Sequence, residues 1–535
     1  MAQETIAQEK TFARKASGLV RGLSLIDTIG VGYMNQGLTP SIWIMMLTLA
    51  IYPGGSIPLA VILSAVLAGI GYTMVWGVLG GSMPRSGGSY IYTSRIIHPA
   101  IGLAVSFCNA FVMLMWIWLL APFIADPGLV WLFQFLGNPE AGAFFETPQG
   151  MVIVGTLANI FGFLVAVFGA RVFSISQKVL MVLGTVGAAV ICLIFTFTSR
   201  GAFVAAWDGL AAQYGSLDYG SLVAAVRDTG VDIPSSWNFF DTLGIMVGGS
   251  WLFAYGYFIT FIGGEVKRPE RSIILGNLFA VLIPAVFVLW LGIVMYKAVG
   301  FEFVSATAVV DWEEGLAGYN LPWLPHFAGL AAVITRNPIL LILIAGSFCI
   351  FNLWWVALSY LSFPRMIFAW GMDRVGPTWF TDVNPRWASP VKNYILCFVL
   401  GELGILLYAF WNNPAAALSI TGMQVVSVFG VTAIAATIFP YVKKVRHIWE
   451  ASPYRHWNVL GIPAVTIGGI VNLVYLAILF YFYVTAPDLE GLTGPSVIAY
   501  VVIWVIGLAW YYFYKWYNAR EGIDVDLAYS ELPPE

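Results

Sequence analysis

Long uninterrupted apolar runs limit what this chain can fold into. Twelve runs reach the ~20 mostly apolar residues that an α-helix needs to cross a bilayer, and none has the alternation of a strand. Only 10% of the 535 residues are charged, whereas a soluble domain usually carries about 25%. We therefore expect an all-α polytopic membrane protein. The expected spans are 24–51, 56–81, 99–125, 150–170, 173–198, 241–264, 273–297, 338–362, 392–411, 416–440, 460–485 and 494–516.

The basic residues predict how these spans are oriented. If both termini are cytoplasmic, four of the 25 Lys and Arg fall outside, which leaves 25 − 4 = 21 on the cytoplasmic side. The four are Arg200, Arg227, Lys297 and Arg336. Because cytoplasmic loops are enriched in Lys and Arg, we expect a multi-pass protein of the cell membrane with both termini inside.

The chain is expected to divide into six parts. They are a cytoplasmic N-terminal segment 1–22, helices 1–5 over 23–198, an external loop 199–240, helices 6–10 over 241–440, helices 11 and 12 over 460–516, and a cytoplasmic tail 517–535. Two long external loops, 199–240 and 298–337, are expected to hold short surface helices.

Two expected spans contain glycine breaks. The first reads DTIGVGYMNQG over 27–37, and the sixth reads GGSWLFAYGY over 248–257. Glycine costs about 1 kcal/mol in a helix interior, and unwound backbone is tolerated within a membrane only where it lines a protein cavity. Such backbone offers N–H groups to a carboxylate and C=O groups to an ammonium, as in transporters. The alternative is that these glycines allow close packing of helices.

Ionisable residues inside a membrane are costly, so they are candidate functional groups. Asp27 and Glu402 lie within expected spans and are the candidate coupling groups. Asp27 lies about one turn before Gly30, and the alternative role for it is to pair with a substrate ammonium. Lys178 lies near the cytoplasmic start of helix 5, where its side chain can reach the interface.

Several motifs, in this order and spacing, resemble those of the amino acid–polyamine–organocation permeases. They are Gly30-x-Gly32, MPRSGGSYIY over 83–92, GEVKRPER over 264–271, and RMIFAW over 365–370 after helix 8. The resemblance covers roughly residues 20–440. It implies the leucine-transporter type of fold, a 5+5 inverted repeat of helices, with two extra helices.

The resemblance also implies a substrate site at the two breaks. In the family, the Gly-x-Gly of helix 1 binds the substrate carboxylate, which implies this role for Gly30, Val31 and Gly32. The unwound part of helix 6 binds the amino group, which falls on Phe253, Ala254, Tyr255 and Gly256. An aromatic gate would be Trp251. We expect it to cover an apolar pocket that suits a neutral or aromatic side chain better than a charged one.

A cytoplasmic gate is expected among charged and polar residues on the inner side. The candidates are Arg85, Tyr90, Glu265, Arg365 and Asp373, with Arg95 and Glu270 on the same side. Ion pairs among them would hold the inner gate closed.

Two departures leave the coupling ion open. Some members have a glutamate soon after the helix 6 break, where this chain has Tyr257, and some have a lysine inside helix 5, where it has Gly184. Proton coupling or exchange is favoured over sodium, because helix 8 carries Trp354-Trp355 near where small hydroxyl side chains would be wanted.

The expected function is secondary active transport of amino acids by alternating access. A polyamine or organic-cation permease of the same fold is the alternative. A membrane enzyme is disfavoured because the four Cys and four His form no catalytic or metal-binding pattern, so no cofactor or metal is expected. A channel or receptor is disfavoured because the polar groups cluster at two breaks instead of along a pore. The expected partners are a small-molecule substrate and membrane lipid, with no nucleic acid, and the sequence leaves the oligomeric state open.

Overall fold

The computed structural model describes residues 21–411, 414–486 and 494–533. These residues are almost entirely helical, apart from one short hairpin in which β1 (Asn458–Val459) pairs with β2 (Ile462–Pro463). The expected N-terminal segment, 1–22, lies outside the described residues except for its last two.

Eleven helical stretches of the described residues are long and apolar enough to cross a membrane. They are Ile57–Ser82, Pro99–Phe135, Pro148–Val167 (α9), Ala170–Phe197 (α10), Phe239–Phe261, Pro269–Ala298 (α15), Pro338–Met372 (α18), Val391–Trp411 (α19), Ile420–Tyr441, Ala464–Thr485 (α22) and Gly494–Arg520 (α23). The composite stretches contain α3 (Ile57–Tyr72) and α4 (Val78–Ser82), α6 (Pro99–Leu120) and α7 (Val130–Phe135), α13 (Phe239–Gly244) and α14 (Met246–Phe253), and the end of α20 (Pro414–Ile438).

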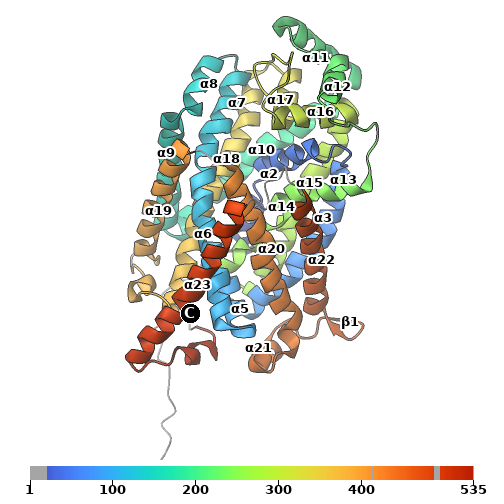
Figure 1. The fold of residues 1–535 in the computed structure, drawn as a ribbon. Coiled ribbons are helices and arrows are strands. Elements are labelled where there is room, and N and C mark those ends of the chain that lie inside the picture. Colours follow the sequence, from blue (N-terminus) through green and yellow to red (C-terminus); the bar gives the residue numbers. More distant parts are fainter. Residues whose placement is uncertain (1–20, 412–413, 487–493, 534–535) are drawn as a thin grey trace, which may run out of the picture.

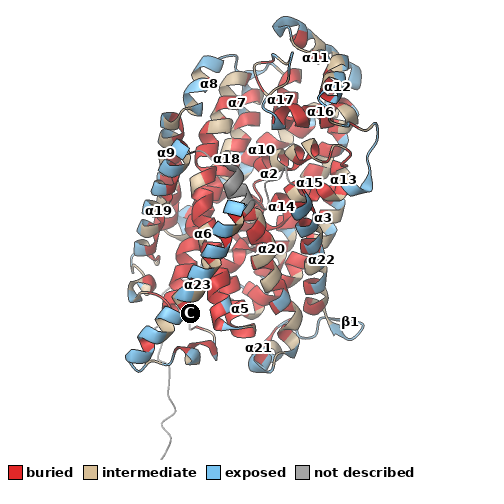
Figure 2. Ribbon diagram, viewed as in Figure 1, coloured by how far each residue is buried: buried red, intermediate tan, exposed pale blue. Residues whose placement is uncertain are grey.

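The outer helices present apolar side chains away from the protein interior. Leu157 on α9, Val182 on α10, Leu403 on α19 and Val505 on α23 are each more than half exposed. Figure 2 shows these helices with exposed outer faces around a buried centre. An apolar surface of this extent marks a membrane contact, so the chain is a polytopic membrane protein.

The expected first span, 24–51, consists of two shorter helices, α1 (Leu25–Met34) and α2 (Leu38–Leu47). The chain can turn between them because Gly37 adopts a left-handed φ of 54°, which glycine reaches without strain. Pro40 then falls in the first turn of α2, where its missing N–H costs no hydrogen bond. Neither half alone is long enough to count among the eleven.

Short helices gather at both ends of the bundle (Figure 1). One end, here called the loop end, carries α8 (Pro139–Glu146), α11 (Arg200–Tyr214), α12 (Tyr219–Asp228), α16 (Phe301–Trp312) and α17 (Phe327–Ile334). The opposite end, here called the tail end, carries α5 (Ser89–Ile96), α21 (Arg446–Ala451), the hairpin and the C-terminal segment. Both long loops contain short helices as expected. Helices α11 and α12 lie at the surface, but the expectation of surface helices is wrong for 298–337, because α16 and α17 are largely buried.

Helix α18 is longer than the expected span 338–362. It continues to Met372, so residues 365–370, expected after the helix, are helical and almost fully buried. Its 35 residues extend about 52 Å at 1.5 Å per residue, well beyond a hydrocarbon core of about 30 Å. The extra turns carry Arg365 to the tail end and place Asp373 at the helix terminus.

We expect Gly37→Ala to destabilise the protein by roughly 2 to 4 kcal/mol. A left-handed φ costs a residue with a side chain about 1–2 kcal/mol, and a Cβ here would overlap the Trp355 ring. Thermal unfolding of the purified protein measures the loss. Gly346→Ala on α18 is the matched control, because a Cβ there meets nothing within 4 Å. Equal stability of the two variants would contradict the prediction.

Candidate functional site

The break in the first span lies at Asn35, Gln36 and Gly37. Helix α1 ends at Met34, and the left-handed Gly37 turns the chain into α2. The Asn35 carbonyl accepts a hydrogen bond of 2.7 Å from Nε1 of Trp355 on α18. A side chain of α18 therefore replaces part of the helical bonding that the break removes, which buried backbone requires in a membrane.

The break in the sixth span lies where the sequence predicts it. Helix α14 ends at Phe253, and after Ala254 the backbone continues as the tighter 3₁₀-helix η5 (Tyr255–Phe261). Gly256 lies at this change because a Cβ there would come within 2.8 Å of the Ala280 Cβ.

The two breaks hold each other. The Asn35 side chain donates a hydrogen bond of 2.7 Å to the Tyr255 carbonyl, and the Tyr255 amide donates one of 3.2 Å to Oε1 of Gln36. Both amide side chains are fully buried, yet Oδ1 of Asn35 and Nε2 of Gln36 have no hydrogen-bond partner among the described residues. Buried polar atoms normally have partners, so these two atoms point to a bound molecule or water between the breaks.

The expected unwinding at Gly30, Val31 and Gly32 is wrong, because all three residues are buried inside α1. A Cβ at Gly32 would approach the Ala280 Cβ to 2.8 Å and Cδ1 of Ile259 to 2.9 Å. These glycines thus allow close helix packing, which was the alternative interpretation. The sequence feature that marks the observed break is the polar pair Asn35-Gln36, directly before Gly37.

Trp251 lies within a cluster of large aromatic side chains. Its ring stacks on Trp116 at 6.0 Å between centroids and lies 5.6 Å from Tyr255 and 5.9 Å from Trp355. Trp251 also lines the cavity described next, so it lies between that cavity and the breaks. Its role as a gate stays a prediction. Aromatics make up 16% of the chain, so the sequence carried no signal that selects Trp116 or Trp355.

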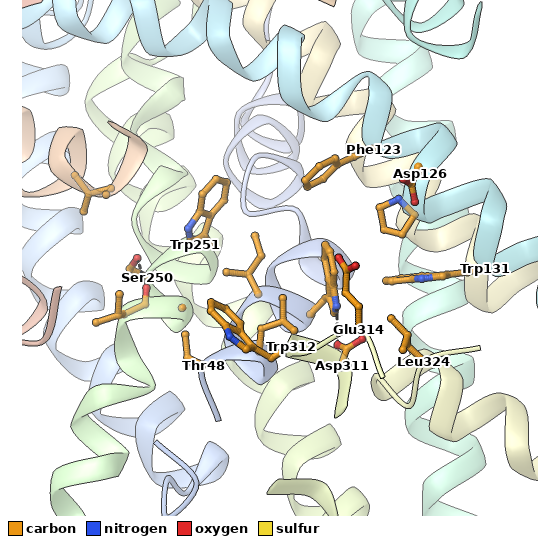
Figure 3. Close-up of a pocket in the computed structure, with 18 of the residues that line it drawn as sticks. Thr48, Phe123, Asp126, Trp131, Ser250, Trp251, Asp311, Trp312, Glu314 and Leu324 are labelled. Atoms are coloured by element: carbon orange, nitrogen blue, oxygen red, sulfur yellow. Dashed lines mark hydrogen bonds between the residues drawn. The ribbon is translucent and has the colours of Figure 1, made fainter. Parts of the chain in front are cut away.

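A cavity of about 720 Å³ lies towards the loop end. It is lined by Trp43 of α2, Trp131 of α7, Trp251 of α14 and Asp311 of α16, among others. Figure 3 shows Trp251 on the side of the view opposite Asp126 and Trp131. The space therefore connects the aromatic cluster to the long loops.

The lining of this cavity is acidic. Asp126, Glu146, Asp311 and Glu314 line it, and none of its described lining residues is Lys, Arg or His. Most of the other lining residues are apolar or aromatic, so these acidic groups border a largely apolar space. The expected preference for a neutral or aromatic side chain stays a prediction. The ionised carboxylates among the four acidic residues concentrate cations in the cavity. Glu314 is exposed, whereas burial raises the pKa of Asp311 to about 7, so Asp311 is only partly charged at neutral pH.

Asp27 lies far from both breaks. Its carboxylate accepts hydrogen bonds from Ser24 and Ser174 and forms an ion pair of 2.8 Å with Lys178. Asn35 lies eight positions further along the chain, or about 12 Å along the helix axis. Asp27 lines a second cavity, of about 400 Å³, with Glu265 and Arg365. It is therefore committed to Lys178 and does not reach a ligand at the breaks, while its coupling role stays a prediction.

Glu402 joins α19 to α9. Its carboxylate accepts hydrogen bonds of 2.5 Å from Thr156 and 3.0 Å from Asn159, and Asn159 also accepts a hydrogen bond from the Tyr360 hydroxyl. These contacts hold the two helices together on the outer side of the bundle. These structural contacts account for a carboxylate at this position without any role in coupling. The coupling role of Glu402 stays a prediction.

Two buried ion pairs lie at the tail end. Arg95 on α5 pairs with Asp373 through contacts of 2.6 and 2.9 Å, and Arg365 pairs with Glu265 at 2.7 Å. The Tyr90 hydroxyl donates to Asp373 at 2.9 Å. All five side chains are at most about 6% exposed. Arg85 lies apart and donates to the Pro533 carbonyl at 2.5 Å. The proposed gate residues thus form these contacts, while gating itself stays a prediction.

Comparison with known proteins identifies the family. The family model described as amino acid permease matches residues 37–528, so the chain belongs to the amino acid permease family. A stretch of 227 residues is 25% identical to "Cationic amino acid transporter 4, vacuolar" of Arabidopsis thaliana. That stretch covers 42% of this chain and 34% of the plant protein.

We expect the stability of the protein to depend on pH through Asp311, which lies in α16 outside the expected spans. Burial raises the pKa of its carboxyl from 3.8 to about 7, although a hydrogen bond from Nε1 of Trp43 opposes the shift. Between about pH 4 and pH 7 the folded protein therefore binds more protons than the unfolded chain, and stability falls as pH rises. Asp311→Asn keeps a hydrogen-bond acceptor for Trp43 and removes the loss of stability with rising pH.

Melting temperatures at pH 5 and pH 7.5 test the prediction. The decrease in melting temperature between these two pH values should be smaller in Asp311→Asn, by an amount equivalent to about 2.5 kcal/mol. The linkage acts over about 2 pH units, from pH 5 to the folded pKa of about 7. Glu313→Gln on the adjacent exposed turn is the control and should behave as the wild type. An unchanged decrease in Asp311→Asn would refute the assignment.

Proposed function

We propose that this protein is a secondary active transporter that moves amino acids across a membrane by alternating access. The observation that carries the proposal is the meeting of two broken helices, where Asn35 and Gln36 hold the peptide of Tyr255. An acidic cavity approaches this point from the loop end, and buried ion pairs close the tail end. We infer from the charge distribution that the loop end faces outside and the tail end faces the cytoplasm.

In this proposal α1 and α2 together form one span, which brings the count to twelve. The first ten spans would be two five-helix repeats, with the two breaks at equivalent positions, and the last two spans would be additional. Paired discontinuous helices at the centre of a transporter support this arrangement.

The substrate would bind between the breaks. The start of α2 directs its N–H groups and positive dipole end at the break, which suits a carboxylate. The end of α14 directs the carbonyls of Phe253 and Ala254 at the same region, which suits an ammonium. The unpartnered Gln36 Nε2 lies 3.3 Å from the position of a Cβ on Gly256, so it would contact a ligand there.

Gln36→Leu tests this site. The change keeps the size of the side chain but removes its amide, so the dissociation constant of the transported amino acid should rise at least tenfold, or about 1.4 kcal/mol. Asn472→Leu on α22 is the matched control. It removes a buried amide whose side-chain atoms also have no described partner, but its backbone and Cβ pack against Gly71, away from the breaks.

Binding is measured first as a thermal shift of the purified protein against the twenty amino acids and simple amines, since a ligand stabilises the state it binds. Saturable, gradient-driven uptake into proteoliposomes is measured next. The proposed function would be ruled out if the protein bound and carried none of these compounds. Equal affinities of Gln36→Leu and Asn472→Leu for the substrate would show that the substrate binds elsewhere.

A positively charged amino acid or amine is a second candidate substrate. The observation that favours it is the cavity with four carboxylates and no basic residue among its described lining residues. The similarity to a plant protein named as a cationic amino acid transporter also supports a positively charged substrate.

We expect Glu314→Gln to raise the KM for lysine or arginine about two- to fivefold at low salt and to leave the KM for leucine unchanged. Removing one charge weakens attraction that acts on cations only, and salt screens it. Glu313→Gln is the control, since Glu313 is exposed and does not line the cavity. Equal effects on lysine and leucine would assign Glu314 a structural role.

Asp27 is the proposed coupling group, because its pairing with Lys178 lies at a cavity that opens at the tail end. Asp27→Asn should abolish uptake driven by a pH gradient and spare exchange of internal for external substrate. Glu402→Gln is the comparison, and it should retain both activities because Glu402 only bridges α19 and α9. Full pH-driven uptake in Asp27→Asn would exclude this role.

A further inference from the structure

The C-terminal segment returns to the bundle after α23 ends. Residues 524–533, here called the tail segment, include the short 3₁₀-helix η11 (Val525–Tyr529). Val525, Ala528 and Tyr529 are at most 2% exposed, although this segment follows an exposed helix end. Figure 1 shows it folded back beneath the helices at the tail end. The burial of so many side chains in a terminal segment requires a specific docking site.

Tyr529 is inserted at the ion pair between Arg95 and Asp373. Its hydroxyl lies 3.1 Å from that of Tyr90, which itself donates to Asp373. The Arg95 guanidinium lies 5.0 Å from the centre of the Tyr529 ring and reaches the Ala528 carbonyl at 3.4 Å. Burial and the nearby Asp373 raise the pKa of Tyr529 well above its usual value, so its phenol keeps its proton. The tail segment thus contacts Arg95 directly and is linked to Asp373 through the Tyr90 hydroxyl.

Further contacts fix the two ends of the tail segment. At its start, Asp526 pairs with Lys515 at 2.7 Å and accepts a hydrogen bond from the Tyr511 hydroxyl at 3.2 Å. At its other end, the Pro533 carbonyl accepts the hydrogen bond from Arg85. The pair of Lys515 and Asp526 is about half exposed, and such pairs are weak. The contacts of the tail segment with the ion pair itself are made by Ala528 and Tyr529.

We propose that the tail segment is a removable clamp, in which Tyr529 holds α5 against the end of α18 and keeps the tail end closed. The proposal rests on the alternating access of the proposed function. Opening towards the tail end must separate Arg95 on α5 from Asp373 at the end of α18. Tyr529 contacts Arg95 and Tyr90 on α5, whereas α23, from which the tail segment continues, is bonded to the chain just after α18 by a hydrogen bond of 2.8 Å from Nδ2 of Asn518 to the Arg374 carbonyl. The tail segment therefore links the two elements, and Tyr529 must leave α5 before or as they part. Tyr529 is a positioning residue that acts on the gate and does not touch the substrate.

Cysteine labelling of the resting protein tests the clamp without any substrate. A reporter, Ser359→Cys, is placed in a background with Cys108, Cys192, Cys349 and Cys397 replaced. Ser359 is fully buried on α18, four residues after Trp355 and so on the same helical face, between the breaks and the gate. A second reporter, Thr48→Cys, lines the loop-end cavity. A small maleimide is the probe.

Tyr529→Ala should raise the labelling rate at position 359 about five- to tenfold, which corresponds to the loss of one hydrogen bond and one cation–π contact. Truncation after Gly522 should have at least that effect. Tyr529→Phe, which keeps the ring over Arg95, should lie between wild type and Tyr529→Ala. Ser530→Ala is the control, because Ser530 is exposed and bonds only to Leu527 within the tail segment. Labelling at position 48 should stay constant or fall.

Unchanged labelling at position 359 in both Tyr529→Ala and the truncated protein overturns the proposal. Increased labelling at both reporters also overturns it, because this shows general loosening instead of a shift between two states. Neither readout requires uptake, so loss of the clamp and failure of the proposed transport are recorded separately.

Discussion

In lipid every backbone polar group must be bonded within the protein, and the rest of this structure depends on how two interrupted helices meet that demand. Each break leaves peptide groups without their helical partners. The side chains of Asn35 and Gln36 bond the Tyr255 peptide, and Trp355 bonds the Asn35 carbonyl. Because each break completes the other, neither can change its backbone without disturbing both. The centre of the protein is thereby one polar unit inside an apolar bundle.

The two ends of the molecule differ because their charges are arranged differently. At the loop end, the charged residues that line the cavity, Asp311 and Glu314 among them, are all acidic. At the tail end, Arg95–Asp373 and Arg365–Glu265 pair opposite charges away from solvent. Removing one partner of a buried pair strands the other and costs about 3–5 kcal/mol. The buried charges named at the tail end are therefore paired, whereas the acidic residues of the loop-end cavity have no basic residue among its described lining residues.

The apolar spans, the presence of helices in the long loops and the helix 6 break followed from the sequence, since long apolar runs and clustered glycines have few structural outcomes. The burial of α16 and α17 did not follow from it. The helix 1 break was misplaced by about one turn, because Gly30 and Gly32 can serve either unwinding or packing, and only their neighbours Ala280 and Ile259 decide. The acidic cavity joins residues far apart in the chain, such as Asp126 and Glu314, through loops without periodic patterns. Likewise, nothing in the tail sequence marks Tyr529 as buried.

The hydrogen bond from Trp43 to Asp311 joins the half-helix α2 to α16 in the long loop above it. Helix α2 is connected to α1 only through the turn at Gly37, so it is the part of the first span that can tilt as a separate body. If α2 tilts, α16 must move with it or the hydrogen bond between Trp43 and Asp311 must break. In the proposed function, a ligand between the breaks would therefore act on the cavity mouth through this bond, together with the bond from the Ser305 hydroxyl of α16 to the Pro53 carbonyl.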